Sequence, residues 1–363
     1  MRQLIYAWIG VLILCQSNVS AGDWKRFRGP NGSAVSEEKN LPVEWSEKKN
    51  LRWKASLPGR GLSSPVVANG RVFVTACTGY KQRRLHILCF DVKSGKKLWE
   101  RRFTATGGTG CHPKTNMAAN TPVTDGKRVY ALFATGDLAA LDRDGNLLWY
   151  RSLVGDYPKI SNQVGMASSP VLHDNILLLP MENADDSFVA GVDATTGKNL
   201  WKIKTRQTTN WTTPVVRTSG GQSEAIFQNR SEVQARDPKT GKLIWELKDV
   251  KLSASCCPNV SGDLVFLSGG PYLAVRPKGK SAEVVWESRR LSSGYSSTLV
   301  HDGKVYALGK VGPRCTNAKT GEELWKTRAT GPFSASPVLA DGKLYCPGET
   351  GIVTVIDVSG EKP

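Results

Sequence analysis

The sequence predicts an all-β protein, a β-propeller of four-stranded antiparallel blades, with seven blades as the expected count and eight as the alternative. A glycine stands four residues before a tryptophan in five short segments, and a hairpin element recurs seven times. Helical periodicity is scarce along the chain. A repeat of about 40 residues with four strand-like runs is typical of a propeller blade. The tryptophan segments end at Trp99, Trp149, Trp201, Trp245 and Trp325, with a looser copy at Trp286; the hairpin elements lie at 63–73, 120–130, 168–178, 212–216, 256–266, 296–306 and 335–345.

The first two strands of each unit read as a hairpin. In residues 63–73, for example, β-branched and aromatic runs flank an Asn-Gly pair, which is a strong hairpin signal. A third run follows and ends in an aspartate, at Asp91, Asp142, Asp193 or Asp237, whose carboxylate can bond the backbone of the next turn. The tryptophan run is the fourth strand, and its large apolar ring suits the seam between two blades.

The ends of the repeat array predict how the ring closes. The segment around Trp53 resembles a fourth strand but has no hairpin before it, and the last hairpin has no tryptophan strand after it. We therefore expect the N-terminal Trp53 strand to complete the last blade. Such closure removes the exposed sheet edges that an open array would present.

The N-terminus predicts export. Residues 1–21 combine Arg2, an apolar run and the small residues Val19-Ser20-Ala21, which is the pattern of a cleavable signal peptide. A lipid anchor at Cys15 is the less favoured alternative, since no small residue precedes it. We expect a signal peptide at 1–21, an N-terminal segment at 22–50, and one propeller domain at 51–363. No later apolar run has the length of a transmembrane segment, so periplasm or cell surface is the expected location.

The net charge indicates the class of partner, and the cysteine content excludes one type of fold. The formal net charge is +17, with the basic residues spread along the chain. This pattern favours a solvated basic surface and an anionic cell-surface polymer as a partner, and it disfavours nucleic acid. Seven cysteines remain after the leader, an odd and scattered set that excludes a fold built on disulfides.

Two linkers predict a candidate binding face. Most connections from a tryptophan to the next hairpin proline span 12 or 13 residues, but those at 99–122 and 149–170 are longer and neighbouring. Equivalent connections lie on one face of a propeller, so both loops should project from the same face. They form a binding surface there, or they are longer loops that pack on each other without a binding function. The first holds Cys111, His112, Lys114 and Asn116, and the second holds Tyr157, Asn162 and Gln163. Cys111 and His112 are metal-ligand types, but adjacent residues rarely converge on one ion, so no metal site is expected.

Two motifs resemble a known family. The signature "AGVDATTGKNLW" at 190–201 and the N-terminal stretch "DWKRFRGPNGSAVS" at 23–36 resemble the exported bacterial PQQ-like (pyrroloquinoline-quinone-like) repeat β-propellers. That family includes quinoprotein dehydrogenases and a propeller lipoprotein of the outer-membrane barrel-assembly machinery. The resemblance implies the propeller fold but does not decide the activity. We expect an envelope scaffold without catalytic residues or cofactor, which binds a protein or a cell-surface polymer through the face that carries the long loops.

Two alternatives remain open beside the scaffold. A quinoprotein oxidoreductase would bind PQQ with calcium and needs a stacking tryptophan, for which Trp211 beside Asn210 is the candidate. No position matches the metal ligands or the catalytic base of such an enzyme. A glycan-binding protein would use Trp211, Tyr157 and Tyr295 as sugar platforms.

The adjacent cysteines Cys256 and Cys257 belong to the repeat. They occupy the places of Ser63-Ser64 in an earlier copy, directly before the hairpin proline. The pattern favours exchange of one small residue for another near the channel mouth. A disulfide between neighbours would be strained, because Cα atoms across a trans peptide lie about 3.8 Å apart, below the usual disulfide span of about 4.4–6.8 Å.

Overall fold

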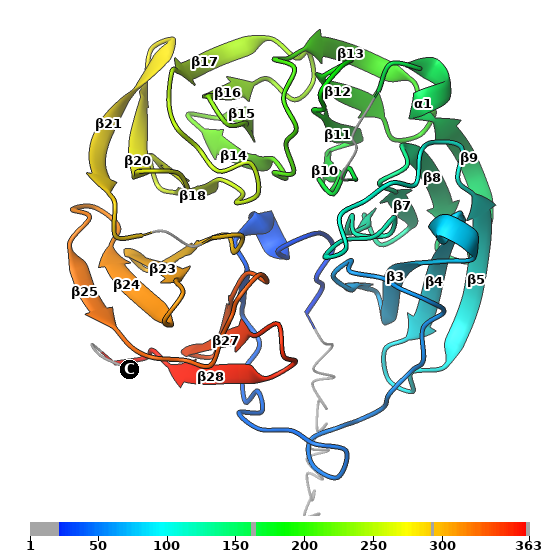
Figure 1. Cartoon of the computed structure of the whole chain (residues 1–363), viewed down its shortest axis with the longest axis horizontal. Helices are drawn as coiled ribbons and strands as arrows, with labels where there is room; N and C mark the ends of the chain where they lie inside the picture. The colour runs from blue at the N-terminus through cyan, green and yellow to red at the C-terminus, as the bar shows by residue number, and fades with distance from the viewer. Residues whose placement is uncertain (1–21, 161–164, 292–293, 361–363) are drawn as a thin grey trace, which may run out of the picture.

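Seven sheets of four strands surround a central axis (Figure 1). The structure is a computed structural model that describes residues 22–160, 165–291 and 294–360; the predicted signal peptide lies outside these ranges. The predicted propeller and its seven blades are confirmed. None of the helices in the described ranges is long and apolar enough to cross a membrane.

The first six blades follow chain order from the innermost to the outermost strand, and all their pairings are antiparallel. The part of the chain that the structure describes also contains three single-turn helices: η1 (Pro30–Gly32), η2 (Tyr80–Gln82) and α1 (Leu153–Asp156). The first blade comprises β2 (Val66–Ala68), β3 (Arg71–Thr78), β4 (Arg84–Asp91) and β5 (Lys97–Thr104), and the second comprises β6 (Val123–Thr124), β7 (Arg128–Leu132), β8 (Asp137–Asp142) and β9 (Leu147–Ser152). The third blade comprises β10 (Val171–His173), β11 (Ile176–Met181), β12 (Phe188–Asp193) and β13 (Asn199–Lys204), and the fourth comprises β14 (Val215–Ser219), β15 (Gln222–Gln228), β16 (Glu232–Arg236) and β17 (Leu243–Lys248). The fifth blade comprises β18 (Asn259–Ser261), β19 (Leu264–Leu267), β20 (Tyr272–Lys278) and β21 (Ser281–Ser288), and the sixth comprises β22 (Leu299–His301), β23 (Lys304–Leu308), β24 (Pro313–Asn317) and β25 (Glu323–Lys326).

The seventh blade is closed by the N-terminus, but not by the expected strand. It comprises β1 (Val35–Ser36), β26 (Val338–Ala340), β27 (Lys343–Pro347) and β28 (Val353–Asp357). The short strand β1 pairs parallel with β26 on the inner side of the blade. The prediction that the Trp53 strand completes this blade is wrong, because residues 51–57 form no strand.

Trp53 nevertheless packs as a seam tryptophan. Its indole nitrogen donates to the carbonyl of Val92 at 3.0 Å, and its ring covers Gly95 in the turn before β5. The same arrangement recurs where Trp99 donates to the carbonyl of Arg143 and covers Gly145. Side-chain packing therefore keeps the repeat at this seam although the backbone does not pair.

The blades are also joined by a chain of hydrogen bonds around the channel. In each link, the backbone N–H of the residue before a β-hairpin donates to the side chain of the equivalent residue in the next blade, at 2.9 to 3.1 Å. Six links connect Ser64, Thr121, Ser169, Thr213, Cys257, Ser297 and Ser336 in that order. Among the described residues no seventh link joins Ser336 back to Ser64, so the chain of bonds is open between the seventh and first blades.

The N-terminal segment bridges this open junction from the inside. Trp24 forms a two-way backbone bridge with Val67 in β2 of the first blade, and β1 pairs with the seventh. Directly after Trp24, the carbonyl of Lys25 accepts the backbone N–H of Thr124 in the second blade. Figure 1 shows this dark-blue stretch, with η1, at the centre of the ring. The segment thus fastens the first blade to the last.

Candidate functional site

The strand order defines one functional face. Because the blades are antiparallel, the turns between second and third strands lie at the same end as the linkers from each fourth strand to the next blade. We call this end the mouth face. Both long linkers open onto it, as the sequence predicts, and so does the start of each innermost strand.

Within the described residues, six large apolar side chains are exposed on the mouth face around one part of the ring. They are between 44% and 80% exposed, and all belong to the sixth, seventh and first blades or to the linkers entering them. Large apolar side chains exposed on one face of a protein are candidates for an interaction site. This set, which we call the apolar arc, consists of Leu57, Leu62, Tyr80, Tyr295, Val311 and Ile352.

The first long linker reaches toward this arc. Lys114 pairs with Glu349, in the turn of the seventh blade, at 2.9 Å, and the Pro113 carbonyl accepts from Arg60 at 3.1 Å. His112 is exposed, and its Nδ1 accepts the backbone N–H of Lys114. The predicted residues His112 and Lys114 therefore lie on the mouth face together with Tyr295.

The other two predicted residues of this linker mainly hold its shape. Cys111 is half-buried, and its sulfur contacts the side-chain amide of Gln82 and the carbonyl of Thr115. Asn116 is fully buried, and its Oδ1 accepts the N–H of Ala118 at 2.9 Å. These contacts order the loop and leave little of either side chain for a partner.

The second long linker carries Tyr157 away from the mouth. Tyr157 follows α1 at the outer edge of the ring, beside β9 and β13 (Figure 1). Its hydroxyl accepts from Asn199 at 2.8 Å, and the ammonium of Lys202 lies 3.9 Å from its ring centre. The predicted residues Asn162 and Gln163 lie outside the described ranges.

Trp211 joins two linkers at the mouth. Its indole donates to the carbonyl of Gly165 at 2.7 Å, and its backbone N–H donates to Ala254. The ring is half-buried. Trp211, Tyr157 and Tyr295 lie in different parts of the ring, so the structure does not bring the three aromatic candidates into one sugar-binding surface.

A buried carboxylate lies beside Trp211. The Glu182 side chain accepts from Asn210 at 2.6 Å and from Asn229 at 3.0 Å. Burial raises the pKa of Glu182 to about 7, although both amide hydrogen bonds oppose the shift. Glu182 is not among the predicted residues, because it follows an ordinary apolar strand and meets its partners only through folding.

This cluster does not fit the calcium of a quinoprotein. Calcium requires several oxygen ligands, but Asn210 and Asn229 both turn their NH₂ groups toward Glu182. The orientations are fixed, since the Asn210 NH₂ also donates to the Gln228 carbonyl and the Asn229 oxygen accepts two backbone N–H groups. Within the described residues, no group of three or more His, Cys, Asp or Glu side chains is arranged to hold a metal. We therefore derive no quinone chemistry from this site.

The cysteine pair has a structural place. Cys257 is the fifth member of the chain of inter-blade bonds: its sulfur accepts the N–H of Thr213 at 3.1 Å, and its own N–H donates to Ser297. Cys256 points its sulfur at the carbonyls of Gly294 and Ser296, both at 3.3 Å. The thiol of Cys257 does here what a hydroxyl does in the neighbouring blades, which agrees with the expected register.

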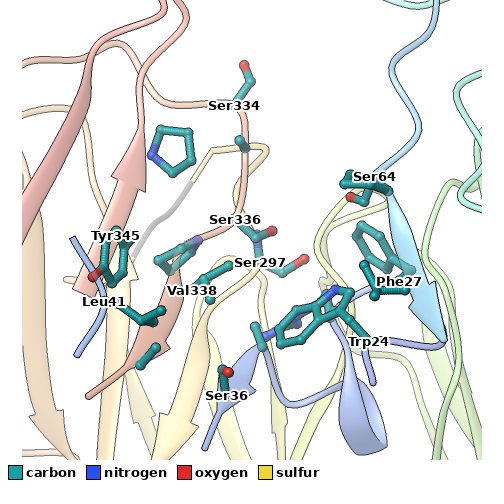
Figure 2. Close-up of a pocket in the computed structure, with 18 of the residues that line it drawn as sticks. Trp24, Phe27, Ser36, Leu41, Ser64, Ser297, Ser334, Ser336, Val338 and Tyr345 are labelled. Carbon is teal, nitrogen blue, oxygen red and sulfur yellow. The ribbon is translucent and has the colours of Figure 1, made fainter. Parts of the chain in front are cut away.

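A pocket occupies the open junction of the ring. Its cavity volume is about 710 Å³, and it is lined by the N-terminal segment and by the first strands of the first and seventh blades. Figure 2 shows Ser64 on one side of the opening, across from Ser334 and Ser336. Tyr295 of the apolar arc also lines it. We call this cavity the seam pocket.

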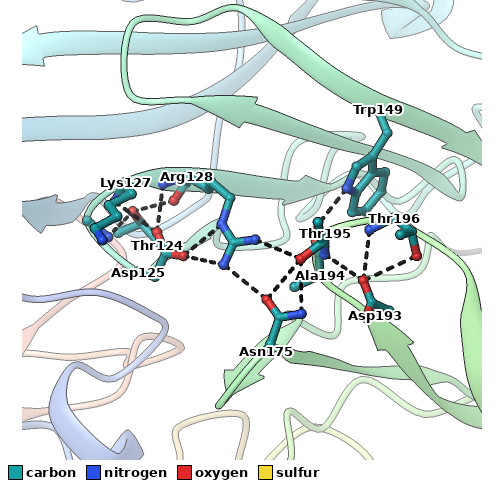
Figure 3. A network of polar contacts seen from close by, with 11 residues as sticks. Thr124, Asp125, Lys127, Arg128, Trp149, Asn175, Asp193, Ala194, Thr195 and Thr196 are labelled. Carbon is teal, nitrogen blue, oxygen red and sulfur yellow. Dashed lines mark hydrogen bonds and ion pairs between the residues drawn. The ribbon is translucent and has the colours of Figure 1, made fainter.

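The opposite face is tied by polar contacts instead. Arg128 pairs with Asp125 in its own blade and donates to Asn175 and Thr195 of the third blade at 3.1 and 3.3 Å (Figure 3). Beside it, the Trp149 indole donates to the Ala194 carbonyl. These contacts hold the second and third blades together at this end.

Comparison with known proteins identifies the family. The family model described as "Outer membrane protein assembly factor BamB" matches residues 29–180, 161–309 and 229–362, which together cover most of the chain. The chain belongs to this family. BamB of Moranella endobia (strain PCIT) is 29% identical over 172 residues, which cover 46% of this chain and 39% of that protein. The chain therefore matches about two fifths of the length of this relative.

Solved structures share the fold. BamB from Moraxella catarrhalis matches with a TM-score of 0.58 at 16% identity, covering 82% of this chain and 83% of that chain. A europium-containing methanol dehydrogenase matches with a TM-score of 0.71 at 12% identity, covering 94% of this chain and 84% of that chain. At such identities the likeness shows the propeller architecture alone. The BamB family and an enzyme thus share one scaffold.

Proposed function

We propose that this protein is an exported, non-catalytic scaffold that binds a protein partner through the apolar arc of the mouth face. The observation that carries the proposal is that six described apolar side chains are exposed at the same end of three consecutive blades. Burying such surface is the main favourable term in protein association. The exposed His112 and Lys114 of the long linker supply a polar border beside it.

Family membership supports an envelope partner. The matching relatives are called outer membrane protein assembly factors, so an assembly factor of the bacterial envelope is the natural role to test. The signal-peptide pattern of residues 1–21 supports export to the periplasm or cell surface. An anionic polymer is the alternative partner that the net charge of +17 favours.

The test compares two triple substitutions. Tyr80, Val311 and Ile352 of the apolar arc are replaced by glutamate in one variant; Leu98, Leu200 and Leu324, exposed on the outer strands, are replaced in the matched control. Tagged proteins are returned to the source envelope and partners are quantified by mass spectrometry. We expect the arc variant to lose a specific protein at least tenfold and the control to retain it.

Two results would contradict the proposal. Equal retention by the two variants would show that the arc does not contact the partner. Retention of only anionic polymer by the unsubstituted protein, with no protein enriched, would favour the polymer. Thermal unfolding of both variants checks that neither substitution acts through loss of the fold.

A further inference from the structure

The seam pocket contains a buried cation without a countercharge. Arg28 lines the pocket and is only 5% exposed. Its Nη2 donates to the Asn259 side chain at 2.8 Å and to the Thr298 carbonyl. Its Nε and Nη1 are buried with no hydrogen-bond partner, and no carboxylate within the described ranges forms an ion pair with it.

This arrangement is energetically costly as it stands. An unsatisfied buried donor is destabilising, and more so when it carries charge. Desolvation lowers the pKa of the Arg28 guanidinium, and the nearby side chains of Cys257, Tyr272 and Cys256 act in the opposite direction. The backbone of Arg28 is also held at a φ of 62°, a conformation that side-chain-bearing residues rarely adopt. Cost and strain at one residue are typical of a position kept for binding.

The apolar walls of the pocket indicate a ligand that is itself largely apolar. They are formed largely by Trp24, Phe27, Leu41, Leu62, Val338 and Tyr345. Cavities of about 300–1,000 Å³ with apolar walls and a few polar groups are typical of small-molecule sites. A strongly hydrated inorganic anion gains nothing from such walls.

The broken chain of inter-blade bonds adds polar groups to the lining of the same pocket. Ser64 and Ser336 both line the pocket, and the bond that would join them is missing. A carboxylate can accept from the Ser64 hydroxyl and from the Ser336 N–H, as the side-chain oxygens do at other junctions. Glu38 is the other charged side chain lining the pocket, and its carboxylate accepts the N–H of Gly22.

We propose that the seam pocket binds an apolar ligand that carries one carboxylate, with Arg28 as its counter-ion. The apolar body of the ligand packs on the walls, and its carboxylate supplies the negative charge that the described residues around Arg28 lack. The pocket shares Leu62 and Tyr295 with the apolar arc, but ligand binding here does not depend on a protein partner at the arc, and the proposal stands if that one fails.

The test uses decanoate as the probe and the full chain as the protein. Binding is measured by calorimetry at constant ionic strength, with decanol as the uncharged match and inorganic phosphate as the anion without an apolar body. We expect saturable decanoate binding, at least tenfold weaker decanol binding, and none with phosphate. An acetyl-Leu-Glu-Leu-amide peptide and its glutamine version show whether the carboxylate can also come from an acidic peptide.

Variants locate the site. Arg28→Met keeps an apolar stem of similar length, and replacing a buried charge with an apolar group is often tolerated; we expect decanoate to bind at least tenfold more weakly and decanol to be unchanged. Leu62→Glu keeps Arg28 and adds a negative charge at an exposed pocket residue, so it should weaken decanoate binding without disturbing the fold. Leu57→Glu, in the same linker but outside the pocket lining, is the control.

Any one of three results overturns the proposal. The first is that decanoate binds no better than decanol and the two peptides also bind equally. The second is that decanoate binding is unchanged in Arg28→Met, and the third is that Leu62→Glu and Leu57→Glu weaken decanoate binding equally. If Arg28→Met does not fold, the comparison of the two leucine variants decides alone.

Discussion

Replacing Glu182 with glutamine should flatten the dependence of stability on pH. Glu182 is 3% exposed, and burial raises its pKa from 4.5 to about 7. In the unfolded chain the carboxyl ionises near pH 4.5, whereas in the folded protein it stays protonated up to about pH 7. The folded state therefore binds more protons in this window, and the free energy of unfolding falls as pH rises through it.

The size of the effect follows from the shift. One unit of pKa corresponds to about 1.4 kcal/mol, so the rise from 4.5 to about 7 costs about 3 kcal/mol of stability, complete above pH 7. The glutamine side chain of the Glu182→Gln variant cannot ionise. Its amide meets the NH₂ groups of Asn210 and Asn229 and carries a penalty, but that penalty does not change with pH.

Urea unfolding of both proteins at a series of pH values measures the effect. The free energy of unfolding of Glu182→Gln minus that of the unsubstituted protein should increase by about 3 kcal/mol between about pH 4 and about pH 8. Because both proteins share all other titrating groups, the contributions of those groups to the pH dependence cancel in this difference. The substitution Glu287→Gln, at an exposed position, is the control for the effect of removing a carboxylate that is not buried. A difference that stays constant within about 0.5 kcal/mol would refute the reasoning, since it would mean that Glu182 is solvated.

Two further substitutions test the ring. Gly145→Ala places a Cβ 2.7 Å from the Trp99 ring, whereas the Cβ of the control Gly220→Ala, also at positive φ, meets nothing within 4 Å. In thermal and urea unfolding, Gly145→Ala should lose about 1–3 kcal/mol more stability than Gly220→Ala. Equal losses would contradict tight packing of the tryptophan against the turn. Cys257→Ala removes the acceptor for the N–H of Thr213 and should cost about 1–3 kcal/mol. Cys257→Ser, measured the same way, should restore most of this loss, and similar losses for both would show that the inter-blade bond contributes little.

The repeat made much of the ring predictable from sequence. A glycine four residues before a tryptophan marks a turn at positive φ, and Gly145 and Gly95 indeed lie under the indoles of the preceding seam. The repeat register also predicts the place of Cys257, because the position before the hairpin proline makes the same inter-blade bond at six consecutive junctions. Such local rules carry over wherever the repeat is intact.

The closure and the buried polar clusters were not predictable in this way. Strand β1 has only two residues and no repeat signature, so the sequence pattern predicts the more repeat-like Trp53 segment in its place. Arg28 meets Asn259 across 231 positions of sequence, and Glu182 meets Asn229 across 47. No local pattern encodes contacts of this range, which depend on the ring being closed.

Site-specific photo-cross-linking tests the proposed scaffold function most directly. A benzophenone side chain is placed at Tyr80 or Ile352 in the apolar arc, and at Lys242 in an exposed turn at the opposite end of its blade. After irradiation in the source envelope, we predict one protein adduct of the same size from both arc positions and none from Lys242. Equal adducts from all three positions, or no protein adduct from the arc, would contradict partner binding through the mouth face.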